Sequence, residues 1–306
     1  MSFGPSVRPY TSGFFQLSLD DSENTKAYLK VVDGGTPEQE VMSERFGSSL
    51  LTLQHASVAM IKDISFEIGL AGSKGVLRWI KNSWIKKFDR RSGQIDHGDF
   101  DGVVQYTQEF SNALIAETTF PALDGSSTKP GYLKVKFTPE SVGEPGASGN
   151  LDVDYGRKQK LWTCDNFKFS IDGIDGMEFT NSLKEFSVKQ TIKKMATGED
   201  RFQEIMPSKI EFPTITGTIA EAYAGPLKEW ATKYLYKGQR DPKAQRTGSL
   251  EFRAANGKVL FRINMFAMSL KKLGVATSQA NAGDIKRLQF ELHVERMDLD
   301  AELGFD

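Results

Sequence analysis

The side chains best suited to catalysis are three histidines, His55, His97 and His293, and one cysteine, Cys164. A nucleophile needs a base beside it, but His55 has no carboxylate nearby in the sequence and Cys164 has no paired histidine motif. His293 alternates with apolar residues along an expected strand, so it should face away from the core. We therefore expect no catalytic residue and no enzymatic activity.

Three aspartates, Asp96, Asp99 and Asp101, lie within residues 96–101 and carry oxygens that could bind a hard cation. The spacing does not fit an EF-hand loop, because residues without ligand oxygens fall at positions that need one. The glycines of residues 69–75 suggest a phosphate loop, yet the required Gly-Lys-Ser/Thr ending is absent. We expect a polar loop at 96–101, with no metal site and no cofactor.

The composition of the 306 residues is that of a folded protein, with 39% hydrophobic and 26% charged residues. The formal net charge of -1 provides no general attraction to nucleic acid or to an anionic membrane. A single cysteine excludes an intrachain disulfide and suits a reducing compartment. No apolar run is long enough to span a bilayer and no signal peptide is evident, so we expect synthesis in the cytoplasm and no membrane insertion.

The chain contains an internal repeat, which bears on the whole fold. At a constant shift of 146 residues, Ile64 falls on Ile210, Phe66 on Phe212, Trp84 on Trp230, Gly102 on Gly248, Leu114 on Leu260 and Phe120 on Phe266. The shift is 152 for residues 15–20 and 155 for residues 133–137. Chance similarity of two β-rich halves is the alternative. On the repeat, we expect Trp84, Trp230, Phe120 and Phe266 to be core anchors.

The repeat divides the chain into two domains. We expect an N-terminal arm at 1–12, a first domain at 13–138, a linker at 139–163, a second domain at 164–299 and a C-terminal tail at 300–306. The boundary is placed by residues 139–149, which contain three glycines and two prolines without apolar periodicity.

Each domain is expected to be mainly β. Strict alternation of apolar residues predicts a strand at both ends of each copy. Further strands are expected at 64–70, 103–110, 113–120, 210–215, 249–254 and 258–268, with a type I′ hairpin turn at Asn256-Gly257. An apolar stripe predicts one helix per copy, one that begins at Pro226 and ends before Gly238 and one around Leu77, Ile80, Trp84 and Phe88. The fold class is therefore two tandem β-barrels or sandwiches, each with one amphipathic helix.

This arrangement resembles the tail tube proteins of contractile-tailed phages and of related contractile injection systems. The second copy carries the resemblance: residues 167–173 resemble the first strand of that family, and residues 225–230 (Gly-Pro-Leu-Lys-Glu-Trp) its tryptophan-bearing helix. Residues 248–266 resemble its hairpin and residues 288–295 its closing strand. The chain departs from the family in having two copies where one is usual.

The resemblance implies self-assembly into rings of six tube domains, as a trimer or a hexamer of this chain, stacked into a hollow tube. It also implies a tail sheath protein, baseplate or initiator proteins and a tape measure protein as partners, with DNA passing through the lumen without sequence-specific binding. The location would be a virion tail, assembled in the host cytoplasm, or an injection system. A baseplate hub or tube initiator that forms a single ring is one alternative. A monomeric β-barrel module that binds a ligand is another.

Three segments are candidates for the assembly interface. An expected loop at 89–101 is rich in aspartate, whereas its counterpart at 236–248 is basic, so the two could dock between copies, and two solvated turns are the alternative. A third expected loop, at 271–287, is the place where the second copy appears longer in the sequence. Trp79, which lies off the helical stripe, is a candidate for an exposed contact with a neighbour or the sheath, and covering its own domain is the alternative. The charged candidates are Asp96, Asp99, Asp101, Lys237, Arg240, Lys243, Arg246, Lys271 and Lys272.

Overall fold

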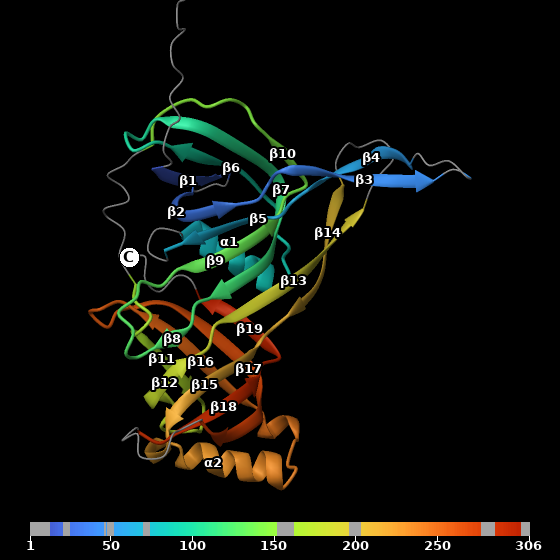
Figure 1. Ribbon diagram of the computed structural model, residues 1–306. Helices are drawn as coiled ribbons and strands as arrows, with labels where there is room; N and C mark the ends of the chain where they lie inside the picture. Colours follow the sequence, from blue (N-terminus) through green and yellow to red (C-terminus); the bar gives the residue numbers. More distant parts are fainter. Residues whose placement is uncertain are drawn as a thin grey trace, which may run out of the picture.

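The structure, a computed structural model, describes residues 13–20, 25–45, 47, 52–69, 74–151, 162–195, 203–276 and 285–300. It contains two β-barrels placed end to end (Figure 1). Helix α1 (Lys74–Trp84) lies between them, and helix α2 (Gly225–Ala231) covers the far end of the second barrel. The predicted fold class, mainly β with one helix per barrel, is confirmed.

The first barrel is a closed sheet in which β7 pairs with both β6 and β9, giving the order β7-β6-β1-β2-β5-β9. Its strands are β1 Phe14–Leu19, β2 Lys26–Asp33, β5 Ile64–Ile68, β6 Arg91–Gly98, β7 Val104–Phe120 and β9 Leu133–Thr138. β10 (Ser141–Gly143) continues β9 along β7. The alternating residues Leu133, Val135 and Phe137 are fully buried, as a strand with one face toward a core requires.

The second barrel has the order β11-β16-β17-β18-β15-β12 and, among the described residues, no pairing between β11 and β12, so it is nearly closed. Its strands are β11 Phe167–Ile171, β12 Thr180–Leu183, β15 Thr214–Ala220, β16 Arg246–Arg253, β17 Val259–Val275 and β18 Arg287–His293. β19 (Arg296–Asp300) pairs with β17 as β10 pairs with β7. β8 (Leu123–Asp124), which follows β7 in the chain, pairs with β12.

Two expected strands, at 103–110 and 113–120, are one continuous strand, β7. The chain bends at Asn112, whose φ of 52° is positive. The expected type I′ turn is also wrong, because at Asn256-Gly257 only the glycine has a positive φ, of 81°. A turn closed by one left-handed glycine connects β16 to β17 instead.

The structural correspondence of the two barrels differs from the constant shift of 146. Leu17 faces Ile95 on β1 and β6 as Phe169 faces Leu250 on β11 and β16, which confirms the shift of 152 for the first strand. Phe137 faces Ile64 as Leu292 faces Ile215, which confirms 155 for the last strand and gives 151 for β5. The shift is thus 151 or 152 up to the helix and 155 from β6 onward. The four additional residues of the second copy (155 − 151) lie between α2 and β16, not at 271–287.

Trp79, not Trp84, is the counterpart of Trp230. Both indole Nε1 groups donate to a backbone carbonyl that lies after the helix: Trp79 to Asp89 at 2.8 Å and Trp230 to Ala244 at 3.2 Å. Trp79 is fully buried, with its ring centroid 5.6 Å from that of Phe137. Of the two interpretations of Trp79, an exposed contact is therefore wrong, and the residue covers its own domain.

Three of the expected core anchors, Trp84, Trp230 and Phe120, are buried. Phe266 is not a core residue. It alternates with the inward-facing Met265 on β17 and lies half-buried beneath the guanidinium of Arg296, whose Cζ is 4.4 Å from the ring centroid. Its selection followed from the shift of 146, which is wrong in this region.

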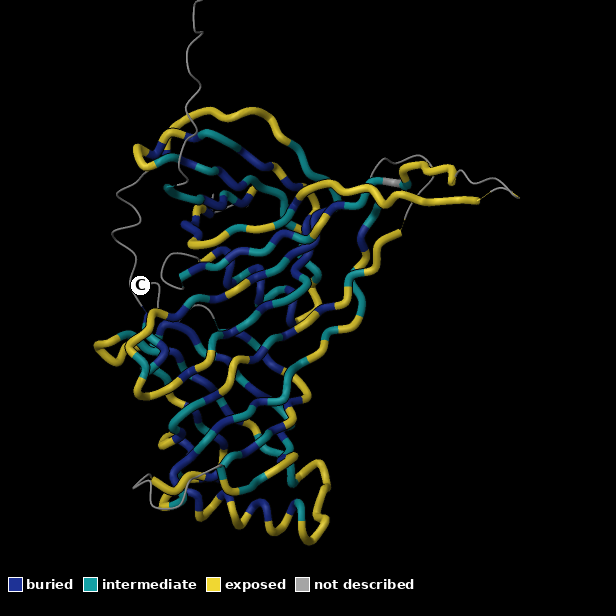
Figure 2. The backbone as a smooth tube through the Cα atoms, in the orientation of Figure 1, coloured by how far each residue is buried: buried dark blue, intermediate teal, exposed yellow. Residues whose placement is uncertain are grey.

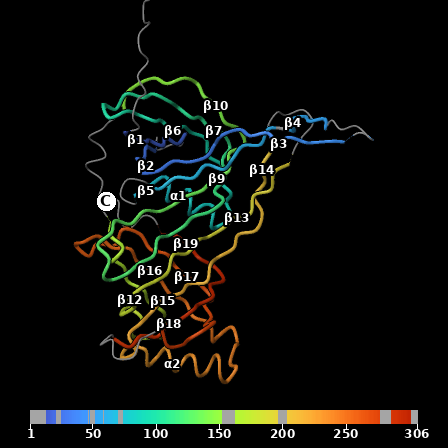
Figure 3. Tube along the Cα trace, in the orientation of Figure 1, coloured from blue at the N-terminus to red at the C-terminus, as the bar shows by residue number. Residues whose placement is uncertain are grey.

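Each copy sends a long hairpin out of its barrel. The first hairpin is formed by β3 (Pro37–Arg45) and β4 (Thr52–Ile61), and the second by β13 (Phe186–Met195) and β14 (Glu204–Glu211). The first projects away from its barrel and is exposed along β3 (Figure 2). The second runs back beside the first barrel, where β13 pairs with the end of β7 (Figure 3).

The expected domain boundaries therefore do not separate the two units in space. The second copy supplies a hairpin to the first barrel, and the expected linker supplies β10, which pairs with β7, and Asn150, which bridges to Val103 just before β7. Residues 152–161 of that linker, and the expected arm at 1–12, lie outside the described residues.

We predict that Trp79→Ala lowers the free energy of unfolding by about 3–5 kcal/mol, because it removes a fully buried indole and its hydrogen bond. Urea unfolding followed by tryptophan fluorescence measures the change. Tyr236→Ala, at a side chain 82% exposed, is the matched control and should change stability by less than about 0.5 kcal/mol. A loss below about 1 kcal/mol for Trp79→Ala would contradict this placement.

Candidate association site

The contact between the second hairpin and the first barrel is a strand pairing. β13 extends the sheet at residues 117–120 of β7, with Phe186 opposite Phe120 and Lys189 opposite Glu117. β9 occupies the other side of this part of β7. We call residues 117–120 of β7, on the side taken by β13, the first edge. The pairing satisfies backbone groups that an edge strand leaves without partners.

Aromatic side chains fill the contact. Phe186 stacks on Phe120 with ring centroids 5.0 Å apart and planes at 14°. Phe120 also lies 5.8 Å from Phe252 of the second barrel, and Trp84 of α1 lies 6.3 Å from Phe212 beyond β14. The two barrels therefore share one continuous apolar core.

Polar side chains fix the position of the second hairpin along the first barrel. Ser83 of α1 donates its hydroxyl to Oε1 of the buried Gln190 at 2.7 Å. The Thr119 and Ser187 hydroxyls lie 2.8 Å apart across the paired strands. A slip of one residue would separate these groups and turn the apolar face of β13 to solvent.

Charged side chains hold the other strand of this hairpin. Arg90 Nη2 donates to the backbone carbonyl of Ile205 at 2.5 Å, and the Ile205 amide donates to Glu140 at 3.3 Å. Ile205 itself is buried against the first barrel.

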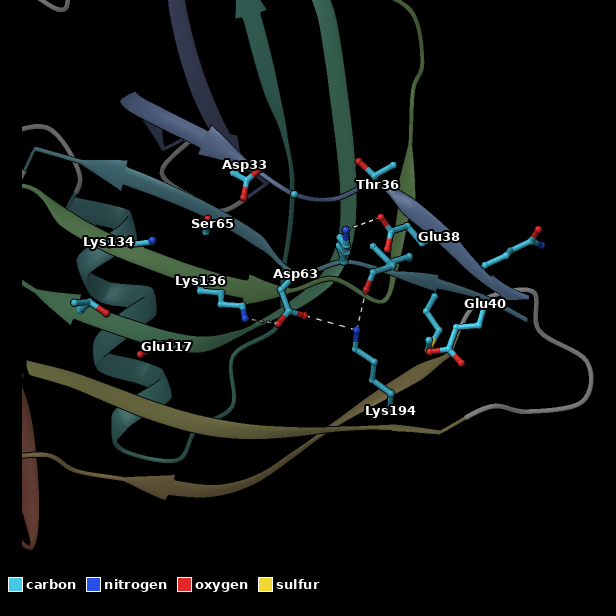
Figure 4. Close-up of a pocket in the computed structure, with 16 residues that line it drawn as sticks. Asp33, Thr36, Glu38, Glu40, Asp63, Ser65, Glu117, Lys134, Lys136 and Lys194 are labelled. Atoms are coloured by element: carbon cyan, nitrogen blue, oxygen red, sulfur yellow. Dashed lines mark hydrogen bonds and ion pairs between the residues drawn. The ribbon is translucent and has the colours of Figure 1, made fainter. Parts of the chain in front are cut away.

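A cavity of about 840 Å³ lies where the two hairpins meet the first barrel (Figure 4). Asp63 is at its centre and accepts from Thr138 at 2.8 Å, with the ammonium groups of Lys136 and Lys194 at 3.1 Å and 3.6 Å. Lys194 of β13 also donates to the Ile61 carbonyl of β4 at 2.8 Å. The cavity is thus lined by charges that pair with one another, and Lys194 connects the two hairpins.

The first hairpin has the same construction as the second but no strand beside it among the described residues. Its β-bulge lies between Gln39 and Val41, and the bulge of the second hairpin lies between Gln190 and Ile192, a shift of 151. Its apolar residues Val41, Met42 and Leu53 are exposed, Val41 by 63%. The hairpins were missed in the sequence, although the repeated Gln-x-Val/Ile at this shift was a detectable signal.

The expected acidic loop at 89–101 is largely the central strand β6. Asp96 is buried and accepts from Thr107 at 2.8 Å and from Gln94 at 2.9 Å. Asp99 accepts from the amides of Asp101 and Val103 at 3.0 Å and 2.9 Å and so closes the turn after β6. Asp96 and Asp99 serve the first barrel internally, while Asp101 is exposed.

The basic candidates Lys237, Arg240 and Lys243 are exposed after α2, whereas Arg246 is half-buried at the start of β16. This segment and β6 lie at opposite ends of the molecule (Figure 1), so the structure does not bring the two charged segments together within one copy. Their docking between copies remains a prediction.

Lys271 and Lys272 belong to strand β17, not to a loop. Both are exposed, with their ammonium groups 3.4 Å and 3.7 Å from the carboxylate of Glu291. Residues 277–284 of the expected loop lie outside the described residues.

His97 stands at the end of the first barrel, between Phe15 and Tyr106, at ring distances of 4.9 Å and 5.1 Å. Burial lowers the pKa of His97, although Asp96 opposes the shift. The corresponding residue of the second barrel, at a shift of 155, is Phe252, which contacts Phe120 across the junction. The end of the second barrel that holds Phe252 contacts the first barrel. His97 lies at the corresponding end of the first barrel.

No family model and no curated protein matches the sequence. Among solved structures, the chain is similar to a chain of the sheath–tube complex of PVC, an extracellular contractile injection system, with 17% identity, a TM-score of 0.41, and coverage of 48% of this chain and 100% of that one. It is also similar to the tube-terminating cap of the anti-feeding prophage, with 16% identity, a TM-score of 0.40, and coverage of 48% and 97%.

A third likeness is to Hcp1 from Flavobacterium johnsoniae, with 15% identity, a TM-score of 0.31, and coverage of 45% of this chain and 99% of that one. The first of these solved structures belongs to a contractile injection system, a class that the sequence resemblance also names. No helix among the described residues is long and apolar enough to span a membrane.

We predict that His97 makes folding stability dependent on pH. Because its pKa is lowered in the folded state, the unfolded chain binds the proton more readily, so stability is lost as pH falls from about 6.5 through the folded-state pKa. His97→Phe should flatten the dependence of Tm on pH between about pH 7 and about pH 5. His55→Phe, on exposed β4, is the control. An unchanged slope in His97→Phe would contradict the prediction.

Proposed function

We propose that the chain is a structural subunit that associates with copies of itself into rings, stacked into the hollow inner tube of a contractile phage tail or injection system. The observation that carries the proposal is the junction inside the chain, where one barrel sends a hairpin along the neighbouring barrel. The first hairpin has the same construction and is exposed, so a further barrel can be added in the same way.

A junction that joins unlike surfaces does not end with two copies, because each added chain exposes the same surfaces again. It closes into a ring or continues as a filament. With two barrels per chain, three chains would supply six barrels, and six chains would supply a thicker or double-layered ring. The resemblance to tube proteins favours a closed ring with a lumen.

The partners follow from the resemblance. A sheath protein would surround the tube, baseplate or initiator proteins would start it, and a tape measure protein would occupy it during assembly. DNA or effector proteins would pass through the lumen without sequence-specific contacts, and the net charge of -1 fits a conduit that does not retain nucleic acid. No enzymatic step is part of this function.

A baseplate hub or tube initiator is the second candidate. Two barrels in one chain favour it, since a trimer would join threefold to sixfold symmetry. A monomeric ligand-binding module is less well supported, because the 840 Å³ cavity is lined by charges of both signs that pair with one another.

We predict that the purified protein, concentrated at low and moderate salt, forms hollow rings or stacked tubes in negative-stain electron microscopy. Top views would give the number of barrels in the ring. Stacks of indefinite length support a tube protein, and single rings support a hub. Stable monomers under all conditions, confirmed by sedimentation velocity, would contradict the proposal.

A further inference from the structure

We propose that the first hairpin of one copy pairs with residues 272–275 of β17 in a second copy, and that a row of charges of exchanged sign directs it there. We call residues 272–275 of β17, on the side of β16, the second edge. The inference rests on the proposed function and identifies the partner surface of the exposed hairpin.

The second edge is the counterpart of the first. β16 pairs with β17 only as far as Met268, and beyond it β18 alone pairs with β17 among the described residues. β6 and β9 border β7 in the same way, and there β13 fills the remaining side. Even the β-bulges coincide, between Ile115 and Glu117 in β7 and between Leu270 and Lys272 in β17. The vacant place in the second barrel therefore has the shape of the filled place in the first.

A row of three charges crosses the filled junction. Lys189 of β13 lies opposite Glu117 of β7, with Nζ and Oε1 3.5 Å apart, and Glu117 lies opposite Lys136 of β9. The order across the three strands is positive, negative, positive. Opposite charges on facing residues of neighbouring strands favour this pairing.

The second barrel carries the same row with its signs exchanged. Lys272 of β17 corresponds to Glu117, and Glu291 of β18 corresponds to Lys136, each at a shift of 155. These two residues face each other, with the charged atoms 3.7 Å apart. The third position of the row has no strand among the described residues, and a negative charge there would complete it.

Glu38 of the first hairpin supplies that charge. It precedes its bulge by one residue, as Lys189 precedes the bulge of the second hairpin, at a shift of 151. Glu38 is exposed and pairs only with the exposed Lys62 of its own hairpin among the ion pairs between described residues. Placed on the second edge, it would complete the row Glu38, Lys272, Glu291.

The exchange of sign makes each hairpin specific for one edge. The first hairpin on the first edge would bring Glu38 against Glu117, and the second hairpin on the second edge would bring Lys189 against Lys272. Like charges in facing positions disfavour both wrong pairings. First and second barrels must then alternate along the assembly, which a chain with two similar barrels cannot ensure by shape alone.

The pairing between chains depends more on these charges than the pairing of β13 within the chain does, because the first hairpin offers fewer backbone hydrogen bonds. Pro37 takes the place of Val188 and has no amide hydrogen, so the first hairpin offers one ladder hydrogen bond fewer than β13. Val275, the counterpart of Phe120, is 62% exposed at the end of the second edge. Val275 therefore offers an exposed apolar side chain that a second copy can cover, whereas Phe120 is already buried by the second hairpin of its own chain.

A pair of cysteines tests the contact. Thr36 and Gly274 correspond to Ser187 and Thr119, which face each other in the filled junction, so their Cβ atoms should come within disulfide distance between copies. A Cβ at Gly274 meets no atom within 4 Å. In a Cys164→Ser background, Thr36→Cys with Gly274→Cys should form oligomers linked by disulfides under mild oxidation. Thr119→Cys with Ser187→Cys is the matched control and should form a disulfide without a change in chain number.

Charge exchange tests the specificity. Glu38→Lys in one chain and Lys272→Glu with Glu291→Lys in another should each raise the concentration needed for assembly by about tenfold. A single chain that carries all three substitutions should assemble as the wild type does, because every contact between its copies is again of opposite sign, whether the ring holds three chains or six. Lys209→Glu, at an exposed position of β14 outside the row, should have no effect.

The outcomes separate the inference from the proposed function. Rings or tubes without the Thr36–Gly274 cross-link, or with no effect of charge exchange, would overturn the inference and leave the tube function standing. A wild-type chain that stays monomeric would contradict both. Cross-linked oligomers, with assembly weakened in each charge variant and recovered in the chain that carries all three substitutions, would support the inference.

Discussion

The pairing of β13 with the end of β7 is the contact on which the rest of the structure depends. An edge strand presents backbone donors and acceptors that must find partners once they are removed from water. β13 supplies partners at residues 117–120, and in doing so it buries Phe186 on Phe120 and brings Gln190 to Ser83 of α1. One strand pairing thus closes the core that the two barrels share.

This constraint leaves two strand edges of the chain unfilled. The second barrel provides the hairpin for the first barrel, but among the described residues the first hairpin has no third strand beside it and the end of β17 is paired only with β18. Edge strands with exposed apolar residues such as Val41 and Val275 favour association between chains. Under the proposed function such association would build the assembly, and the charges of exchanged sign at Glu38 and Lys272 would direct it to one partner.

The sequence was sufficient for the elements that obey local rules. Alternation predicted the first and last strands of each barrel with their shifts of 152 and 155, and the apolar stripe predicted both helices. The predictions from the sequence failed where tertiary contacts override these local rules. The sequence comparison matched Trp84 to Trp230 because α1 carries two tryptophans. Both Trp79 and Trp84 are buried, since α1 is covered by its own barrel and also by the second copy. Asp96 was predicted to lie in a loop because it is a charged residue in a polar segment. In the structure it lies on strand β6, where Gln94 and Thr107 donate hydrogen bonds to its carboxylate. The first hairpin was missed because β3 is polar and exposed along its length, and the second because the edge that buries Phe186 and Val188 is set by pairing between distant parts of the chain.

Hydrogen exchange of backbone amides, compared between dilute monomer and concentrated assembly, distinguishes strand pairing within the chain from pairing between chains. We expect β13 to be protected in both states, because its partner belongs to the same chain. We expect β3 and residues 272–275 of β17 to exchange rapidly in the monomer and to become protected together on assembly. Protection of β13 that appears only on assembly, or assembly that leaves β3 and the end of β17 unprotected, would contradict these expectations.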